Sequence, residues 1–99
     1  MIGGFTGSGL PTASCELIDL SAPTPQWTNV PHMAFRRMEH DAVLLPTGDV
    51  LVVGGQQNQG AGAAAEPVLF PELFDGDTQT WSALAPHAVP RMYLSLIHI

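Results

Sequence analysis

The sequence predicts an all-β protein built from short strands, and composition is the first reason. Charged residues make up only 12% of the 99 residues, whereas the chain contains 10 glycines and 9 prolines. Helix interiors exclude both of these residues, so many short strands and turns are favoured over long helices. Two further observations support this prediction: a hairpin signal in the middle of the chain, and a repeat of strands and tryptophans along it.

The hairpin signal lies in residues 42–55. Two apolar runs of strand length, residues 42–45 and 50–53, are joined by a short turn that contains Pro46 and Gly48. Such a pattern predicts a tight antiparallel hairpin. Gly54 and Gly55 then end the second strand, because glycine allows backbone angles and close approaches that other residues do not. A hairpin that ends in Gly-Gly is typical of the centre of a kelch-type propeller blade.

The remaining strands follow from similar signals. Residues 1–4 (MIGG) resemble residues 52–55 (VVGG), so we expect them to end a hairpin whose first strand is missing from the chain. A small, polar stretch over residues 56–65 has no periodicity and predicts a loop. Short apolar or alternating runs predict three further strands, over residues 15–20, 68–74 and 80–84, with turns at residues 21–23 and 75–77.

The repeat has a period near that of propeller blades. Trp27 and Trp81 are 54 residues apart, as are Arg37 and Arg91, and Met38 and Met92, while residues 16–19 (ELID) recur as residues 72–75 (ELFD) with an offset of 56. A period near 50 built from short strands indicates a propeller and not a sandwich. We therefore predict an all-β, kelch-type β-propeller fragment of about two four-stranded blades.

The repeated residues are expected to do the same job in each blade. The two tryptophans are predicted to be aromatic wedges that pack one blade against the next. For Arg37 and Arg91 we expect pairing with a carboxylate or a backbone carbonyl of the adjoining blade, and a substrate role for one of them is the alternative.

Charge and hydropathy exclude several classes of partner. The three cations are all arginine and face nine acidic residues, which gives a formal net charge of -6. Nucleic acid and anionic membrane surfaces are therefore poor partners. The longest apolar run is far shorter than the roughly 20 residues that a membrane span needs. Residues 1–4 have neither the basic region nor the apolar core of a signal peptide. Cys15 is the single cysteine and is predicted to be a packed structural thiol.

Other polar groups give weaker signals. The glycines of residues 4–9 lack the Gly-Lys-Ser/Thr ending of a phosphate-binding loop, so a loop between strands is favoured. The four histidines, His32, His40, His87 and His98, show no spacing that brings them to one face. A hydrolytic triad of His40, Asp41 and a serine lacks its Gly-x-Ser-x-Gly turn. The acidic group of Glu66, Glu72, Asp75 and Asp77 is expected to be solvated and not calcium-binding.

Several motifs taken together resemble a known enzyme family. They are residues 25–27 (PQW), 44–50 (LLPTGDV), Gly54 with Gly55, 71–74 (PELF), Trp81 and 90–93 (PRMY), and they extend over nearly the whole chain. The chain is similar here to the galactose oxidase and glyoxal oxidase group of copper radical oxidases. The hairpin motif is shared with kelch propellers that have no enzymatic role, whereas residues 90–93 are more specific.

The resemblance implies a fragment of an extracellular enzyme that oxidises alcohols or aldehydes with O2 and forms H2O2 at a single copper. In the family the Pro-Arg-x-Tyr element continues with His-Ser, and its tyrosine and histidine bind the copper. Tyr93 matches the tyrosine ligand and Ser95 the serine, but Leu94 stands in the place of the histidine and has no donor atom. The crosslinked cysteine and tyrosine of the family are absent, because Tyr93 is the only tyrosine and none lies near Cys15.

This resemblance sets the expected limits of the fragment and its partners. We expect residues 1–93 to be a partial β-propeller and residues 94–99 (LSLIHI) to be a non-native tail, since the latter look like a translated transposon end used in sequencing libraries. Copper would belong to the full-length parent, and Tyr93 would be the one metal ligand of this inactive fragment. The expected partners are the remaining blades and an alcohol, aldehyde or carbohydrate substrate, with no nucleic acid and no membrane. The alternative is a piece of a non-catalytic kelch propeller that binds protein or carbohydrate.

Overall fold

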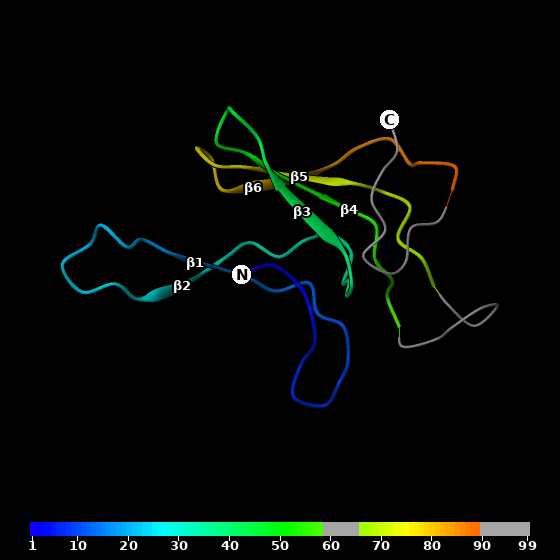
Figure 1. Cartoon of the computed structure of the whole chain (residues 1–99), viewed down its shortest axis with the longest axis horizontal. Coiled ribbons are helices and arrows are strands. Elements are labelled where there is room, and N and C mark those ends of the chain that lie inside the picture. Colours follow the sequence, from blue (N-terminus) through cyan, green and yellow to red (C-terminus); the bar gives the residue numbers. More distant parts are fainter. Residues whose placement is uncertain (59–65, 90–99) are drawn as a thin grey trace.

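The computed structural model describes residues 1–58 and 66–89, and the regular elements in these residues are strands (Figure 1). Two antiparallel sheets are formed, one of two strands and one of four. The strands are β1 (Cys15–Ile18), β2 (Trp27–Val30), β3 (Asp41–Leu44), β4 (Val50–Val53), β5 (Glu72–Asp75) and β6 (Thr80–Ala83). The predicted all-β fold is confirmed. The described residues contain no helix long and apolar enough to span a membrane.

The four-stranded sheet is a simple meander. Its strand order is β3-β4-β5-β6, so each strand pairs with the strand that precedes it in the chain. The predicted hairpin is the β3–β4 pair, in which Asp41 lies opposite Val53 and Leu44 opposite Val50. The Leu45 N–H donates to the Asp49 carbonyl at 2.8 Å and closes the turn. This order is the one expected for a single propeller blade.

The predicted strands over residues 15–20 and 80–84 end at Ile18 and Ala83 in the structure, and the largest difference from the sequence analysis lies before β5. We expected a strand over residues 68–74, but β5 begins only at Glu72. Pro67 and Pro71 flank the missing part, and proline has no N–H to donate to a sheet. In place of a regular ladder, the Val68 N–H bonds to the Gly55 carbonyl at 3.0 Å. The segment before β5 therefore follows the end of β4 without being a strand.

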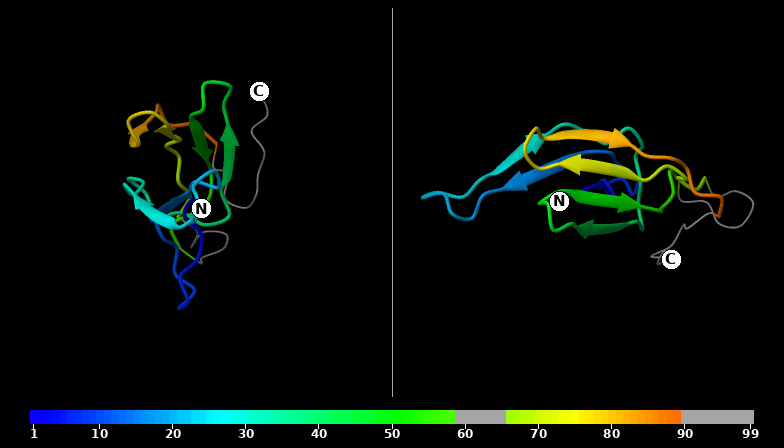
Figure 2. Two further views of the ribbon diagram at one scale, coloured as in Figure 1. Left: turned by 90° about the vertical axis from the view of Figure 1, so that its left-hand side faces the viewer. Right: turned by 90° about the horizontal axis from the view of Figure 1, so that it is seen from above.

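The two-stranded sheet repeats part of this arrangement. In it β1 pairs with β2, with Cys15 opposite Val30 and Ile18 opposite Trp27. Ile2 forms a bridge with Cys15, so the first residues of the chain lie beside β1 as β4 lies beside β5. The expectation that residues 1–4 match residues 52–55 is thus confirmed in the backbone pairing. In the views of Figure 2 the N-terminus lies near the middle of the molecule.

The hydrophobic core lies where the two sheets meet. Cys15, Met33 and Val52 are buried together, and partly buried side chains from both sheets, among them Val30 and Trp81, pack against them. Burial raises the pKa of the Cys15 thiol, and its sulfur contacts the Ala13 carbonyl at 3.5 Å. A thiol held protonated in an apolar environment is a structural residue, as predicted.

The two tryptophans differ in their surroundings. Trp81 stacks at an angle on Phe74, with ring centroids 5.1 Å apart, and its indole N–H donates to the Pro31 carbonyl at 2.8 Å. It therefore links the four-stranded sheet to the chain after β2, which is the predicted wedge role. Trp27 is 57% exposed in the chain as described, so its role as a wedge stays a prediction. Its strand β2 is the outer strand of its sheet, and no other described strand pairs with it.

One glycine of each pair is needed because a segment of chain passes between Gly3 and Gly55. A Cβ atom added to Gly3 would lie 2.8 Å from the Arg37 carbonyl oxygen and 2.8 Å from the His40 ring. A Cβ atom on Gly55 would lie 2.6 Å from the Met38 carbonyl oxygen. Both glycines also have positive φ, 57° and 81°. Residues 37–40, called the crossing segment below, are thus enclosed by Gly3 on one side and Gly55 on the other. No side chain fits at either glycine.

Replacing Gly55 by alanine is predicted to destabilise the fold. The added methyl group combines a left-handed backbone with a backbone clash, so Gly55→Ala should lower the free energy of unfolding by at least about 2 kcal/mol. Urea denaturation followed by tryptophan fluorescence measures this change. Gly7→Ala is the matched control, since an added Cβ there has open space around it. Equal stability of the two variants would contradict the enclosure of residues 37–40.

Candidate functional site

A buried ion pair is the most distinctive polar feature of the described residues. Arg37, which precedes β3, and Glu72, the first residue of β5, are both 0% exposed. The Arg37 Nη2 donates to the Glu72 Oε2 at 2.6 Å and to the Phe70 carbonyl at 2.9 Å, and Nη1 donates to the Gly54 carbonyl at 3.0 Å. The guanidinium is therefore bound by the carboxylate of Glu72 and by two carbonyl groups just outside the sheet, one after β4 and one before β5.

The carboxylate of Glu72 has further donors. The Ala34 N–H donates to Oε1 at 2.6 Å, and the Phe35 N–H donates to Oε2 at 3.4 Å. Desolvation of a buried ion pair costs several kcal/mol per ion, and only good geometry with additional hydrogen bonds offsets it. This site provides both on the carboxylate side. On the arginine side, Nε is buried without a partner in the described part of the chain.

The backbone of Arg37 belongs to the other half of the molecule. Its N–H donates to the Thr12 carbonyl at 3.2 Å, and its carbonyl accepts the Gly4 N–H at 3.0 Å. The main chain is thus bonded to the N-terminal segment while the side chain is bonded to the four-stranded sheet. This confirms the predicted pairing with a carboxylate and backbone carbonyls. Complete burial leaves no face of Arg37 for a substrate. Burial lowers the pKa of Arg37, and the hydrogen bond and charge of Glu72 oppose this.

One part of the acidic group was predicted wrongly. We expected Glu72 to be solvated with its acidic neighbours, but it is buried because Arg37 supplies a cation at that position. The neighbours Glu66 and Asp77 are exposed, as expected. Asp75 accepts the N–H groups of Thr78 and Asp77, and these bonds lower the pKa of Asp75. It therefore caps the turn between β5 and β6.

His40 is the second polar residue of interest in the crossing segment. It lies half-buried between Gly3 and Gly55, and its Nδ1 has no hydrogen-bond partner. Burial and then the charge of Arg37 lower the pKa of His40, while a hydrogen bond with the Ile2 backbone and the charge of Asp41 act in the opposite direction. An Nδ1 without a partner does not match the hydrogen-bonded histidine of a hydrolytic triad.

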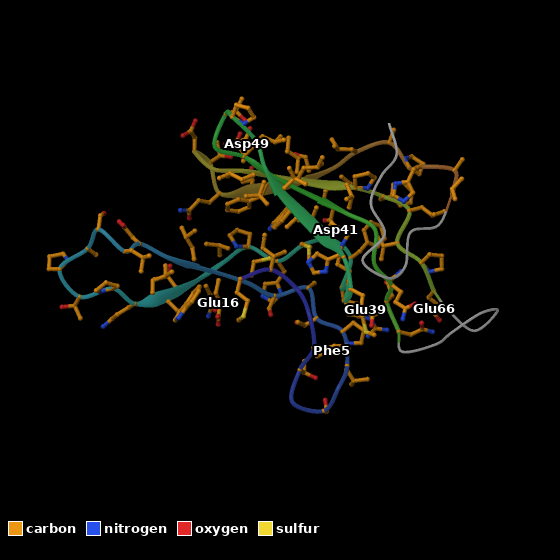
Figure 3. All side chains as sticks on the ribbon, viewed as in Figure 1. Phe5, Glu16, Glu39, Asp41, Asp49 and Glu66 are labelled. Atoms are coloured by element: carbon orange, nitrogen blue, oxygen red, sulfur yellow. The ribbon has the colours of Figure 1, made fainter. Side chains whose placement is uncertain are left out.

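The described residues do not fit a copper site. Within residues 1–58 and 66–89 no three His, Cys, Asp or Glu residues are close enough to hold a metal ion. Figure 3 shows the labelled acidic residues, such as Glu16, Asp49 and Glu66, spread over the molecule and not converging. The predicted ligand Tyr93 lies outside the described residues, as do Arg91, Leu94, Ser95 and His98.

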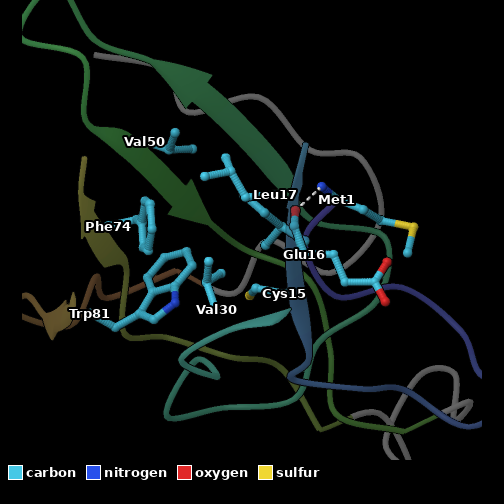
Figure 4. A pocket seen from close by; sticks show the side chains of 9 residues that line it. Met1, Cys15, Glu16, Leu17, Val30, Val50, Phe74 and Trp81 are labelled. Carbon is cyan, nitrogen blue, oxygen red and sulfur yellow. Dashed lines mark hydrogen bonds between the residues drawn. The ribbon is translucent and has the colours of Figure 1, made fainter. Parts of the chain in front are cut away.

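An apolar cavity of about 190 Å³ lies between β1 and the four-stranded sheet (Figure 4). Cys15, Leu17, Val30, Val50, Phe74 and Trp81 form most of its wall. Glu16 is the one charged side chain on the wall, and Figure 4 shows its carboxylate directed toward Met1, away from Phe74 and Trp81. A site for chemistry needs several convergent polar groups, so this cavity is part of the packing between the sheets.

The fold and these polar contacts describe a repeat protein made of antiparallel β-units. A buried arginine joins the units, because its main chain bonds to the N-terminal segment and its side chain bonds to Glu72 of the four-stranded sheet. Residues 8–99 match the family model described as glyoxal oxidase N-terminus. The chain therefore belongs to the glyoxal oxidase family, and the resemblance predicted from its motifs is confirmed.

Three individual proteins illustrate this relationship. The aldehyde oxidase GLOX of Vitis pseudoreticulata is 38% identical over 91 residues, which are 87% of this chain and 17% of that protein. The aldehyde oxidase GLOX1 of Arabidopsis thaliana is 30% identical over 83% of this chain and 14% of its own length. A solved structure described as a novel fungal alcohol oxidase with catalytic diversity among the AA5 family, in complex with copper, has a TM-score of 0.80 and 33% identity. The match covers 94% of this chain and 20% of that structure.

Sequence reasoning did not identify Glu72 as the partner of Arg37. A signal was present, because Glu16 and Glu72 recur along the chain as Arg37 and Arg91 do. Opposite charges that share one repeat are candidates for a repeated ion pair. The separation of 35 residues between Arg37 and Glu72 is too long for any local rule to connect them.

Removing the charge of Glu72 is predicted to be strongly destabilising. In Glu72→Gln the Arg37 guanidinium stays buried without a counter-ion, which should cost about 3 to 5 kcal/mol of unfolding free energy. Urea denaturation measures this loss, and circular dichroism detects a variant that no longer folds. Asp77→Asn removes one exposed carboxylate and should change stability little. A Glu72→Gln variant as stable as Asp77→Asn would contradict the role given to the pair.

The lowered pKa of His40 predicts a pH dependence of stability. Below the ordinary histidine pKa of about 6.5 the unfolded chain binds a proton that folded His40 does not bind. Stability is therefore complete above this pH and falls by up to about 1.4 kcal/mol per pH unit as the pH drops toward the folded pKa. His40→Gln should flatten this slope in denaturation curves measured at several pH values. A steep slope that survives in His40→Gln would disprove the assignment.

Proposed function

We propose that this chain is part of a copper radical oxidase that oxidises alcohols or aldehydes with O2 and forms H2O2. The observation that carries the proposal is the 38% identity, over 87% of the chain, to a protein named an aldehyde oxidase. The likeness to a fungal alcohol oxidase in complex with copper supports it at a TM-score of 0.80. Because the chain spans 17% of the length of the first relative, the activity is proposed for a longer protein.

In this proposal the chain is structural. Residues 1–93 form about two blades of a kelch-type β-propeller, and the other blades of the parent pack on both sides of them. The meander β3-β4-β5-β6 and the repeated glycine pairs support this assignment. An extracellular location of the parent is proposed from the family resemblance.

Tyr93 is proposed to be the ligand that this chain gives to the copper. It follows Arg91, which repeats Arg37 in the sequence, by two residues. Arg37 binds the chain on both sides of the crossing, and an arginine in the same role would fix the backbone just before Tyr93. A single ligand does not make a copper site, so the 99-residue chain by itself should show no turnover.

Leu94 supports a proposal about the end of the sequence. The observation behind it is a leucine in the position of a ligand, which we explain by a non-native tail over residues 94–99. By the 54-residue offset Leu94 aligns with His40, so the equivalent position earlier in the chain has the expected residue type. Sequencing the locus tests this directly, and a continuous reading frame that keeps Leu94 would refute it.

If Leu94 is native, a second function is favoured. The parent would then be a non-catalytic kelch propeller whose loops bind protein or carbohydrate. The complete gene distinguishes the two candidates. The oxidase requires a histidine after Tyr93, a cysteine and a tyrosine able to crosslink upstream, and a further histidine ligand downstream.

The decisive experiment uses the protein encoded by the complete gene, purified and loaded with copper. We expect H2O2 formation from a panel of alcohols and aldehydes, measured by a peroxidase-coupled assay. Loss of a metal ligand costs at least as much as loss of a residue behind it, so Tyr93→Phe should reduce the rate by at least about 10-fold. Ser82→Ala, which removes an exposed hydroxyl on β6, should keep the rate.

Two outcomes would reject the oxidase. One is the absence of peroxide from the copper-loaded protein with every substrate of the panel. The other is a Tyr93→Phe variant that retains full activity and the electron paramagnetic resonance spectrum of the parent, since an unaltered spectrum means that Tyr93 does not bind the metal.

A further inference from the structure

Glu16 occupies the same position in the two-stranded sheet as Glu72 in the four-stranded sheet. The Glu16 N–H donates to the Met1 carbonyl at 2.9 Å, and the Met1 amino group donates to the Glu16 carbonyl at 2.7 Å. In the other sheet Val52 lies opposite Glu72 in the same antiparallel way. Glu16 and Glu72 are thus equivalent in the backbone as well as in the sequence repeat.

The surrounding segments repeat too. The Thr12 N–H donates to the Gly4 carbonyl at 3.0 Å, and the Val68 N–H donates to the Gly55 carbonyl at 3.0 Å. A bridge between Phe5 and Pro11 corresponds to the bridge between Gln56 and Pro67. The equivalence therefore extends from the glycine pair to the acidic residue in both halves of the chain.

The two halves differ at one edge. In the four-stranded sheet β4 has β3 on one side and β5 on the other, and the segment before β3 supplies Arg37 and a bridge from Met38 to Gln56. Beside residues 1–5, which correspond to β4 and Gln56, the described residues supply neither an arginine equivalent to Arg37 nor a bridge equivalent to that of Met38 with Gln56. Phe5 is accordingly 56% exposed, whereas its equivalent Gln56 is 6% exposed. The ion pair found in residues 1–58 and 66–89 is that of Arg37 with Glu72, so Glu16 has no arginine partner there.

We propose that Glu16 binds the guanidinium of an arginine carried by an additional β-strand, which pairs with the edge of residues 1–2 that lies opposite β1. The chemistry of the occupant follows from the Glu72 site. It is an extended segment with one arginine, preceded by two backbone N–H groups that also bond to the carboxylate, as Ala34 and Phe35 do. The Glu16 carboxylate faces Met1, the side on which such a strand would lie (Figure 4).

The occupant is assigned to the parent chain before residue 1. The arginine is expected 35 residues before Glu16, the separation that joins Arg37 to Glu72. This inference rests on the longer propeller of the proposed function, but not on its oxidase activity. Stability and peroxide formation are measured separately, so a protein without activity in which Glu16 still matters would refute only the oxidase.

The test compares Glu16→Gln and Glu72→Gln in the 99-residue chain and in the protein from the complete gene. In the longer protein both variants should raise the unfolding equilibrium constant by more than about 100-fold, since each leaves a buried arginine unpaired. In the 99-residue chain only Glu72→Gln should do so. Asp77→Asn is the control in both proteins. A change of less than about twofold for Glu16→Gln in the longer protein would overturn the proposal.

Two further measurements keep the proposal falsifiable if Glu16→Gln does not fold. A gene that encodes no arginine within a few residues of the expected position would overturn it. When the arginine is present, replacing it by leucine together with Glu16→Met should restore folding, because apolar residues can replace a buried ion pair. Failure of this double variant to fold better than Glu16→Gln would also overturn the pairing. A dimer of the 99-residue chain that Glu16→Gln dissociates would show that a second copy supplies the arginine, against the assignment to the preceding segment.

Discussion

The buried guanidinium of Arg37 is the interaction on which the arrangement of the two sheets depends. Its main chain is hydrogen-bonded to the N-terminal segment. Its side chain is hydrogen-bonded to Glu72 in β5 and to the carbonyl groups of Gly54 and Phe70. A hydrophobic contact could hold the sheets together but would not define their relative position, because apolar attraction has no direction. The guanidinium does define it, because its donors lie in a rigid plane and three hydrogen bonds from Nη1 and Nη2 fix that plane. The ion pair thus fixes the relative position of the two sheets, while the small hydrophobic core stabilises their contact.

The glycine pairs and the arginine act at the same crossing. Residues 37–40 come within contact distance of Gly3 on one side and Gly55 on the other, so the backbone has little freedom to shift. This restriction brings Arg37 to its carbonyl and carboxylate partners and leaves His40 with an unpaired nitrogen. A local conflict of this kind is tolerated because the surrounding hydrogen bonds determine the path of the chain. His40 therefore carries an energetic cost that increases when it is protonated.

Local signals predicted most of the fold, and non-local contacts explain what they missed. The β3–β4 hairpin, the turn after β5 and the all-β class follow from alternating or apolar runs and from Gly and Pro, which act within a few residues. The burial of Glu72 depends on a partner 35 residues away, and the exposure of Trp27 depends on what packs against β2. The position of β5 was shifted by Pro67 and Pro71, which a count of apolar residues does not weigh. The candidate copper ligand could be named only through family resemblance, because no rule of composition or spacing distinguishes Tyr93 from a buried aromatic residue.

The Arg37 contacts also bear on how such a protein grows. Arg37 precedes β3, the first strand of the four-stranded sheet, and its side chain bonds to Glu72 in that sheet. Its backbone, however, bonds to Gly4 and Thr12 in the preceding half of the chain, so one sequence repeat contributes to two neighbouring β-units. Duplication of DNA by any whole number of periods then gives every interior sheet its cation automatically. Mismatched charges arise only at the two ends of the array, and a closed ring of such units has none. Circular architecture is in this sense the electrostatically complete form of the repeat.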